Sequence, residues 1–237
     1  MPIVRLDKLM GDMGIASRKE LKQIIRSGRV SVDGIVVTVP ETKVDGEKNR
    51  VFLDSRELLY SRFHYYMLNK PRGILSATED GRQRTVLDLV TPEMRRMGLF
   101  PVGRLDKDTS GLLLLTDDGN FAHRVISPKS GVEKLYYAKV DGSPSDADAE
   151  AFENGIILAD GTRCLPAKLE ITGEHECLVR VMEGKYHQVR RMLASRKMPV
   201  LELRRLSIGA LKLDPDLAPG KFRELEQGEI DKVFKAT

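Results

Sequence analysis

The chain has 237 residues, of which 41% are apolar and 5% aromatic, and its net charge is +4. This length and composition indicate a soluble globular protein with room for two domains and exclude a disordered chain. No apolar run is long enough to cross a bilayer, and the first ten residues lack the apolar stretch of a signal peptide, so we expect a cytoplasmic protein. Cys164 and Cys177 match neither a zinc site nor a disulfide framework, and we expect two reduced thiols and no metal.

The first clear element is a short helix that begins after Ser17. Ser17-Arg18-Lys19-Glu20 has the form of a capping box, in which the first side chain and the last satisfy each other's backbone. Apolar residues recur at Leu21, Ile24 and Ile25 and form one face. Gly28 follows as the stop signal of the helix.

A tight hairpin and a family resemblance follow. Asp33-Gly34 separates two β-branched runs, 30–32 and 35–37, which is typical of a hairpin. Residues 3 to 50, with RLDKLMGDMGIASRKELKQIIRSGRVSVDGIVV at their centre, resemble the S4 RNA-binding module of ribosomal and RNA-modifying proteins. In that family the helix and hairpin present basic side chains to RNA phosphates, although the same charges could equally belong to a solvated face. The resemblance implies phosphate contacts by Arg18, Lys19, Lys22 and Arg29.

Apolar periodicity weakens between Thr42 and Arg62 and restarts at His64. We therefore expect an S4 module with its linker over residues 1–60 and a second domain over residues 61–237. Strands are expected at 65–68, 112–116, 135–140, 167–172 and 177–181, and helices at 118–125, 145–154 and 187–197. Short connections favour antiparallel pairing. The sequence thus predicts an α+β fold, in which a small module of helices and a hairpin precedes a domain built on a mixed, largely antiparallel sheet with flanking helices.

Basic residues gather late in the chain. Residues 180–212 contain nine Lys or Arg and two Glu, so this segment carries +7 while the rest of the chain sums to −3. A solvated helix face explains part of this surplus. A concentrated basic surface nevertheless favours a polyanionic partner, and nucleic acid is the common one.

Four motifs follow one another in the second domain. They are NKPRG at 69–73, GRLDKDTSGLLLLTDDG at 103–119, KLY at 134–136 and EGKYHQVRRM at 183–192. Together they resemble the pseudouridine synthases of the RsuA branch over nearly all of residues 63–237, with the S4 module where that branch usually carries it. The stretches DDGNFAHRVISPKSGVEKLYY and EGKYHQVRRM resemble the small-subunit ribosomal RNA enzymes of the branch more than its large-subunit enzymes.

The resemblance implies that Asp106 is the catalytic aspartate. Isomerising uridine breaks the N-glycosidic bond, turns the uracil and rejoins it through carbon, so a carboxylate attacks the sugar, attacks the base or removes a proton; these routes stay open. A glycoside hydrolase normally needs a second carboxyl group as acid. Uracil can leave as a delocalised anion, so one carboxylate suffices and no organic cofactor or metal is expected. Asp108 is the rival carboxylate, whereas Asp117-Asp118-Gly119 is typical of a turn and helix start.

A carboxylate that stays ionised among phosphates needs a neighbouring cation. On a helix that advances about 100° per residue, Val189 and Met192 lie on the apolar face, Arg190 flanks that face, and Arg191 lies nearly opposite. The resemblance also matches the basic residue of the family's third motif to Arg190. We expect Arg190 to pair with Asp106 and Arg191 to contact RNA or solvent.

Tyr136 matches the tyrosine of the family's Lys-x-Tyr strand, which implies that its ring stacks on a flipped base with the hydroxyl near the reacting atoms. Tyr137 is the alternative, and strand alternation lets only one of the two face the cleft. Gly111 would allow a tight backbone bend before Leu112. His187 remains open between a base, a helix cap and an RNA contact. Expected RNA contacts in this domain are Lys70, Arg72, Arg104, Lys185, His187 and Arg191.

The sequence therefore predicts a monomeric RNA pseudouridine synthase that acts on small-subunit ribosomal RNA or its assembly intermediate. A large-subunit enzyme of the same branch is one alternative. A non-catalytic S4 ribosome-binding factor is another, but the joint presence of Asp106, Tyr136 and Arg190 disfavours it. A nucleoside-cleaving hydrolase would release free uracil, and it would lack its second acid.

Overall fold

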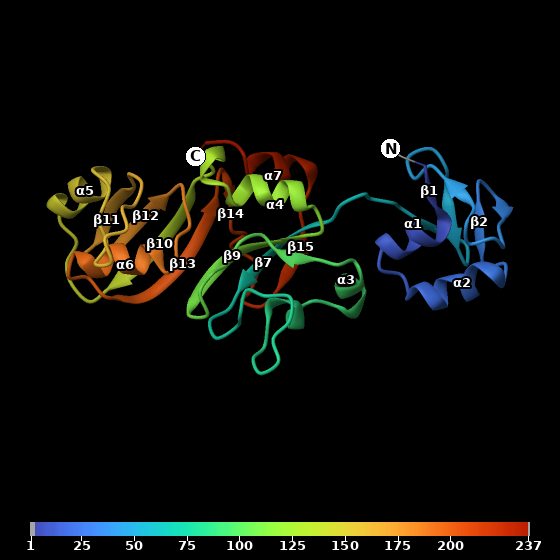
Figure 1. Ribbon diagram of the computed structural model, residues 1–237, viewed down its shortest axis with the longest axis horizontal. Helices are drawn as coiled ribbons and strands as arrows, with labels where there is room; N and C mark the ends of the chain where they lie inside the picture. Colours follow the sequence, from blue (N-terminus) through green and yellow to red (C-terminus); the bar gives the residue numbers. More distant parts are fainter. Residues whose placement is uncertain (1–2, 237) are drawn as a thin grey trace. The chain divides into compact units, whose positions relative to one another are not determined.

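The computed structural model describes residues 3–236 and has two units (Figure 1). One unit contains the residues up to His64 together with 90–99, and the other contains 65–89 and the residues from Phe100 onwards. The fold is of the expected class, with a small N-terminal module and a domain built on a mixed sheet. No helix within residues 3–236 is both long enough and apolar enough to cross a membrane.

The first unit contains α2 (Arg18–Arg26), which begins at the expected capping box. Its Ser17 side chain accepts from the backbone of Glu20, and the Glu20 carboxylate accepts from the backbone of Ser17. Gly28 follows with a φ of +76°, a conformation that favours glycine. The other elements are β1 (Val4–Arg5), α1 (Leu6–Asp12), β2 (Val30–Val32), β3 (Ile35–Val36), β4 (Lys43–Val44), β5 (Val51–Leu53), β6 (Arg56–Leu58) and α3 (Pro92–Arg96).

The second unit is built on one sheet with the strand order β11-β12-β10-β13-β9-β7-β15. Its strands are β7 (Tyr65–Lys70), β8 (Phe100–Pro101), β9 (Thr109–Thr116), β10 (Lys134–Val140), β11 (Lys168–Gly173), β12 (Glu176–Val181), β13 (Val200–Ile208), β14 (Leu211–Lys212) and β15 (Phe222–Glu224). Its helices are α4 (Gly119–Ile126), α5 (Asp146–Glu153), α6 (Gln188–Ser195) and α7 (Gln227–Lys232), with short 3₁₀ turns at Val86–Leu89 and Pro128–Ser130. Among the described strand pairs, β9 with β13 is parallel and the rest are antiparallel.

Two apolar cores support this sheet. One core packs Phe152 of α5 and Met192 of α6 against β10, β11 and β12. The other packs Phe121 of α4 and Val233, beside α7, against β7 and β9. Figure 1 shows α5 and α6 flanking one end of the sheet, and α4 and α7 lying together over the other. Each end of the sheet is therefore held by its own apolar core, and the strands in the middle are fixed between the two cores.

Gly111 lies inside β9 and not at the bend before it. Its φ is +102°, and a Cβ atom there would lie 2.3 Å from the carbonyl oxygen of Arg205 on β13. Glycine is needed because the parallel pairing brings the two backbones this close. The requirement comes from strand packing and not from the tight turn that the sequence suggested.

Candidate active site

A cleft of about 70 Å³ lies where four parts of the second unit meet. They are the loop before β9, strand β10, the loop between β12 and α6, and strand β13. The cleft is lined by Asp106, Tyr136, Glu183, His187 and Leu203, among others. Three of the four sequence motifs, far apart along the chain, therefore contribute side chains to one hollow.

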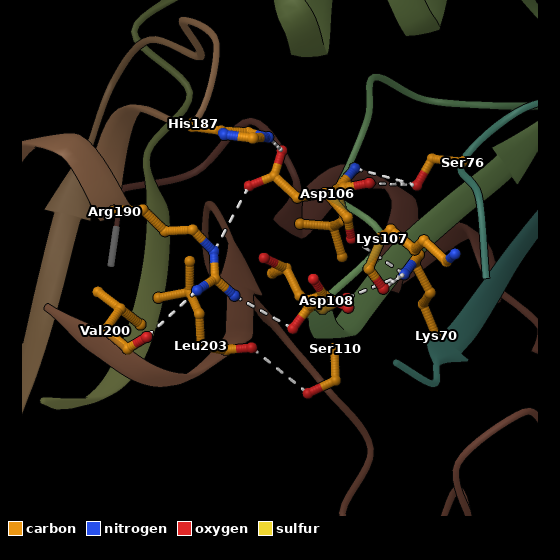
Figure 2. A network of polar contacts seen from close by, with 12 residues as sticks. Lys70, Ser76, Asp106, Lys107, Asp108, Ser110, His187, Arg190, Val200 and Leu203 are labelled. Atoms are coloured by element: carbon orange, nitrogen blue, oxygen red, sulfur yellow. Dashed lines mark hydrogen bonds and ion pairs between the residues drawn. The ribbon is translucent and has the colours of Figure 1, made fainter. Parts of the chain in front are cut away.

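The backbone of the loop that carries Asp106 is held from behind. The Lys70 ammonium, fully buried at the end of β7, donates to the carbonyl oxygens of Asp106 (3.1 Å), Lys107 (3.2 Å), Thr109 (2.9 Å) and its neighbour Pro71 (3.1 Å). Ser76 accepts from the backbone N–H of Leu105 and donates to its carbonyl oxygen. Figure 2 shows these contacts on one side of the loop and the Asp106 carboxylate on the other. The direction of that carboxylate is thus set by the loop.

Lys70 is not available to an RNA phosphate, contrary to our expectation. It stands at the inner end of a buried strand, and its ammonium is enclosed by carbonyl oxygens. Burial lowers its pKa to about 8, against the attraction of Asp106 and Asp108, which raises it. The residue is part of the scaffold under the site.

The Asp106 carboxylate faces two basic side chains from the α6 region. Its Oδ1 lies 3.6 Å from His187 Nε2 and its Oδ2 lies 3.9 Å from Arg190 Nε (Figure 2). The side chain is 31% exposed, so it remains open to a ligand. Asp108 does not line the cleft, and only its carbonyl oxygen takes part here, accepting from Arg190 Nη2 at 3.2 Å.

Arg190 and Arg191 point to different places. Arg190 also donates to the carbonyl oxygen of Val200, at 3.4 Å, and so joins the start of β13 to the Asp106 loop. Arg191 forms an ion pair with Asp160, and hydrogen bonds from Arg191 and Thr162 lower the pKa of that carboxyl to about 2. The expected separation of the two arginines on the helix is present in the structure.

Tyr136 lines the cleft, and Tyr137 does not. Tyr137 follows on the alternate face of β10, where partial burial and a hydrogen bond with Glu176 raise the pKa of its hydroxyl. The Tyr136 hydroxyl instead lies 3.5 Å from Arg205 Nη1. Strand alternation thus separates the two rings as the pattern predicts.

The loop between β12 and α6 holds His187 in an unusual conformation. His187 has a φ of +48°, in the left-handed region, and its side chain makes no capping hydrogen bond to α6. Its ring stacks on Tyr186, with centroids 3.9 Å apart and planes inclined by 18°. The buried Glu183 ties the loop by accepting from the backbone of Leu165 and the side chain of Gln188. The His187 side chain therefore does not cap α6.

The remaining expected RNA contacts vary in how open they are. Arg72 and Arg104 are exposed, while Lys185 lies beside Glu183 in an ion pair. In the first unit Arg18, Lys19 and Lys22 are exposed on α2. Arg29 is also exposed, but its guanidinium forms an ion pair with Asp54. Among residues 3–236, no group of three or more His, Cys, Asp or Glu side chains could hold a metal ion.

Three residues of the site escaped the sequence analysis: Ser76, Glu183 in its anchoring role, and Arg205. Each contacts a residue distant in the chain, as Ser76 contacts Leu105, so no local sequence pattern predicts its role. Arg205 lies on the buried face of β13, and that face contains polar residues, so the sequence did not indicate that it is buried.

The chain matches known families and proteins over almost its full length. Residues 64–195 match the RNA pseudouridylate synthase family and residues 4–49 match the S4 domain. An uncharacterised RNA pseudouridine synthase of Bacillus subtilis is 45% identical, over 96% of this chain and 97% of the relative. The ribosomal small subunit pseudouridine synthase A of Vibrio cholerae is 42% identical, over 98% and 100%, and that of Escherichia coli is 39% identical, over 97% and 100%. A solved structure titled as a pseudouridylate synthase has a TM-score of 0.69 at 34% identity and covers 97% of this chain and 99% of its own.

Proposed function

Because this chain belongs to the RNA pseudouridylate synthase family and carries an S4 domain, we propose that it isomerises a specific uridine of small-subunit ribosomal RNA, with Asp106 as the essential carboxylate. The placement of Asp106 carries this proposal. Its loop is pinned from behind by Lys70, and its carboxylate opens into a cleft between His187 and Arg190. The choice of RNA is supported by near full-length relatives named as small-subunit enzymes in two organisms.

The cleft supplies what the reaction needs from the protein. The C1′–N1 bond breaks, and uracil carries the electron pair away as a delocalised anion. A bond forms from C5 to C1′, C5 loses its proton and N1 gains one, so the product is an isomer of the substrate. Among the described residues that line the cleft, Asp106 and Glu183 are the carboxylates, and Glu183 is buried and engaged by its neighbours. Asp106 is therefore the carboxylate free to act on the sugar, the base or the proton.

The other side chains take supporting roles in this proposal. Arg190 supplies a positive charge beside the Asp106 carboxylate, which offsets repulsion between that carboxylate and RNA phosphates. Tyr136 lies against the flipped base. The RNA backbone is gripped by Arg72, Arg104, Lys185, His187 and Arg191 in one unit and by Arg18, Lys19, Lys22 and Arg29 in the other. The enzyme works as a cytoplasmic monomer on ribosomal RNA or its assembly intermediate.

Two matched variants test the assignment. Asp106→Asn removes the reactive charge without changing volume and eases repulsion from phosphate, so turnover should be lost while RNA binding stays almost intact. Asp108→Asn should retain activity, because that side chain does not line the cleft. Single-turnover assays on unmodified small-subunit ribosomal RNA measure both. Activity in Asp106→Asn, or its loss only in Asp108→Asn, would show that the catalytic carboxylate lies elsewhere.

Chemical mapping of pseudouridine in ribosomal RNA, from cells with and without this chain, tests the target. One position of small-subunit RNA should lose its modification. Loss of a pseudouridine from large-subunit RNA instead would show that the large subunit is the target. Release of free uracil in vitro would show that the enzyme is a hydrolase and not an isomerase.

A further inference from the structure

Arg205 is a buried cation on β13, only 5% exposed, and its register partner on β10 is Tyr136, which lines the cleft. Its Nε donates to the carbonyl oxygen of Leu112 at 2.8 Å, and no carboxylate among the described residues pairs with it. Its Nη2 is buried and has no hydrogen-bond partner. An arginine stays protonated inside a protein, so the fold carries an unpaired donor on a permanent charge. Such a group destabilises the protein and calls for an explanation.

Other buried cations do not relieve this charge. Lys134 donates to the carbonyl oxygens of Val125 (2.8 Å) and Val132 (2.6 Å), and Lys70 donates only to carbonyl oxygens. Burial, together with a smaller repulsion from Arg205, lowers the pKa of each lysine to about 8. Three buried cations therefore lie near one another, and none of them forms an ion pair with a carboxylate of the described residues.

Arg205 and Tyr136 meet across the sheet. They are register partners on β13 and β10, and Arg205 Nη1 lies 3.5 Å from the Tyr136 hydroxyl oxygen, with the guanidinium carbon 6.0 Å from the ring centroid. A guanidinium can only donate, so in this contact the tyrosine oxygen accepts. The hydroxyl proton is then left to point elsewhere. Because Tyr136 lines the cleft beside Asp106, the open direction is the cleft itself.

We propose that Arg205 is a positioning residue that holds the Tyr136 hydroxyl as a hydrogen-bond donor toward the substrate base. This rests on the proposed function, because it requires a uracil against Tyr136. Uracil presents carbonyl oxygens, and negative charge gathers on them as the C1′–N1 bond breaks. A donor fixed in advance stabilises that developing charge more than the uncharged base, and so lowers the barrier.

A double-mutant cycle tests the inference, with single-turnover rates on an unmodified transcript of small-subunit ribosomal RNA. Tyr136→Phe should slow the reaction by about 10²-fold, the usual loss when one such donor is removed. Arg205→Lys keeps the buried charge but cannot reach both Leu112 and the hydroxyl, and it should slow the wild type by roughly tenfold. In the Tyr136→Phe background the same change should have no further effect, because the hydroxyl it positions is gone. RNA affinity should be unchanged throughout.

Lys134→Met is the matched control, since Lys134 is a buried cation near Arg205 that contacts only carbonyl oxygens. Its effect should multiply with that of Tyr136→Phe. Arg205→Gln is measured beside Arg205→Lys, and the unfolding midpoint of each variant identifies any that misfolds.

If the fold-losses in rate of Arg205→Lys and Tyr136→Phe multiply in the double variant, the inference is overturned and Arg205 has only a structural role. A wild-type rate for Tyr136→Phe would overturn it as well, whatever the fate of the Arg205 variants. Asp106→Asn separates the two levels. If it is inactive, a failed cycle refutes only the role of Arg205, whereas an active Asp106→Asn refutes the proposed function.

Discussion

Arg190 and Arg191 are neighbours on α6, yet their guanidinium groups reach different partners. Arg190 reaches the Asp106 carboxylate and the carbonyl oxygen of Asp108, and Arg191 reaches Asp160. Arg190→Ala should therefore lower the single-turnover rate by on the order of 10²-fold, because it removes both the countercharge and a tie that positions the Asp106 loop. Arg191→Ala should leave the rate of the bound complex close to wild type.

The comparison is made with RNA in excess, so that weaker binding does not lower the rate. Arg190→Lys should recover part of the loss, since it returns the charge without the planar donor group. Equal rates for Arg190→Ala and wild type from pH 6 to 9, a rough window around neutrality, would refute the pairing with Asp106.

The sequence could nominate some site residues and not others. Asp106, Tyr136 and Arg190 stand in motifs whose spacing and residue types carry information locally. Lys70 stands in such a motif too, but the motif does not say whether its side chain faces solvent or the core, and the phosphate contact expected of it was wrong. Arg205 acts only through a neighbouring strand, so its importance emerges from the register and not from the residues around it.

At the scale of elements, Lys70 ties the end of β7 to the loop before β9. Its ordinary pKa is 10.5, and burial lowers it to about 8 in the folded protein. Below pH 8 both states are protonated and the cost of burying the ammonium is present in full. Between pH 8 and 10.5 the unfolded chain binds the proton more tightly than the folded chain, so this group's contribution to the free energy of unfolding rises with pH.

Lys70→Met removes that contribution. Urea unfolding at pH 8 and pH 10 should show the wild type gaining stability relative to the variant by on the order of 2 kcal/mol. Tyrosines with raised pKa values, such as Tyr65 and Tyr66, are common to both proteins and cancel in the difference. A constant difference between the two proteins at both pH values would mean that Lys70 titrates normally.

Strands differed in how well their patterns foretold them. The run from Leu112 to Leu115 is buried on both faces of β9, and its four leucines predict a core strand correctly. Strand β13 was not anticipated, because Arg205 and Ser207 lie on its buried side while Leu201 is 54% exposed. Its buried side mixes Leu203 with these two polar residues, so a hydrophobic pattern alone does not reveal such a strand.

At the scale of the whole molecule, the proposal gives the first unit RNA contacts alone and the second unit the catalytic residues together with further RNA contacts. A variant that changes Arg18, Lys19 and Lys22 to Ala removes three exposed charges from α2. It should bind ribosomal RNA more weakly, and the slope of log affinity against log salt should become shallower by up to about 0.9 per lost contact on duplex or 0.7 on single strand. Arg29→Ala should change the slope less, because Asp54 already neutralises that guanidinium.

Binding at several salt concentrations, with the rate at saturating RNA measured alongside, decides the matter. The rate should stay near wild type in both variants. An unchanged slope in the triple variant would show that α2 does not contact RNA phosphates.

The parallel pairing of β9 with β13 spans just three register pairs, and β13 passes from one apolar core, at Leu203, to the other, at Ile208. Asp106 and its loop stand on the β9 side of this narrow seam, while His187 and Arg190 come from the helix region on the other side. A uridine held by both sides would link the two strands across this short pairing. Part of the binding free energy would then appear as resistance of the seam to local opening, so that substrate joins the two halves into a single cooperative unit.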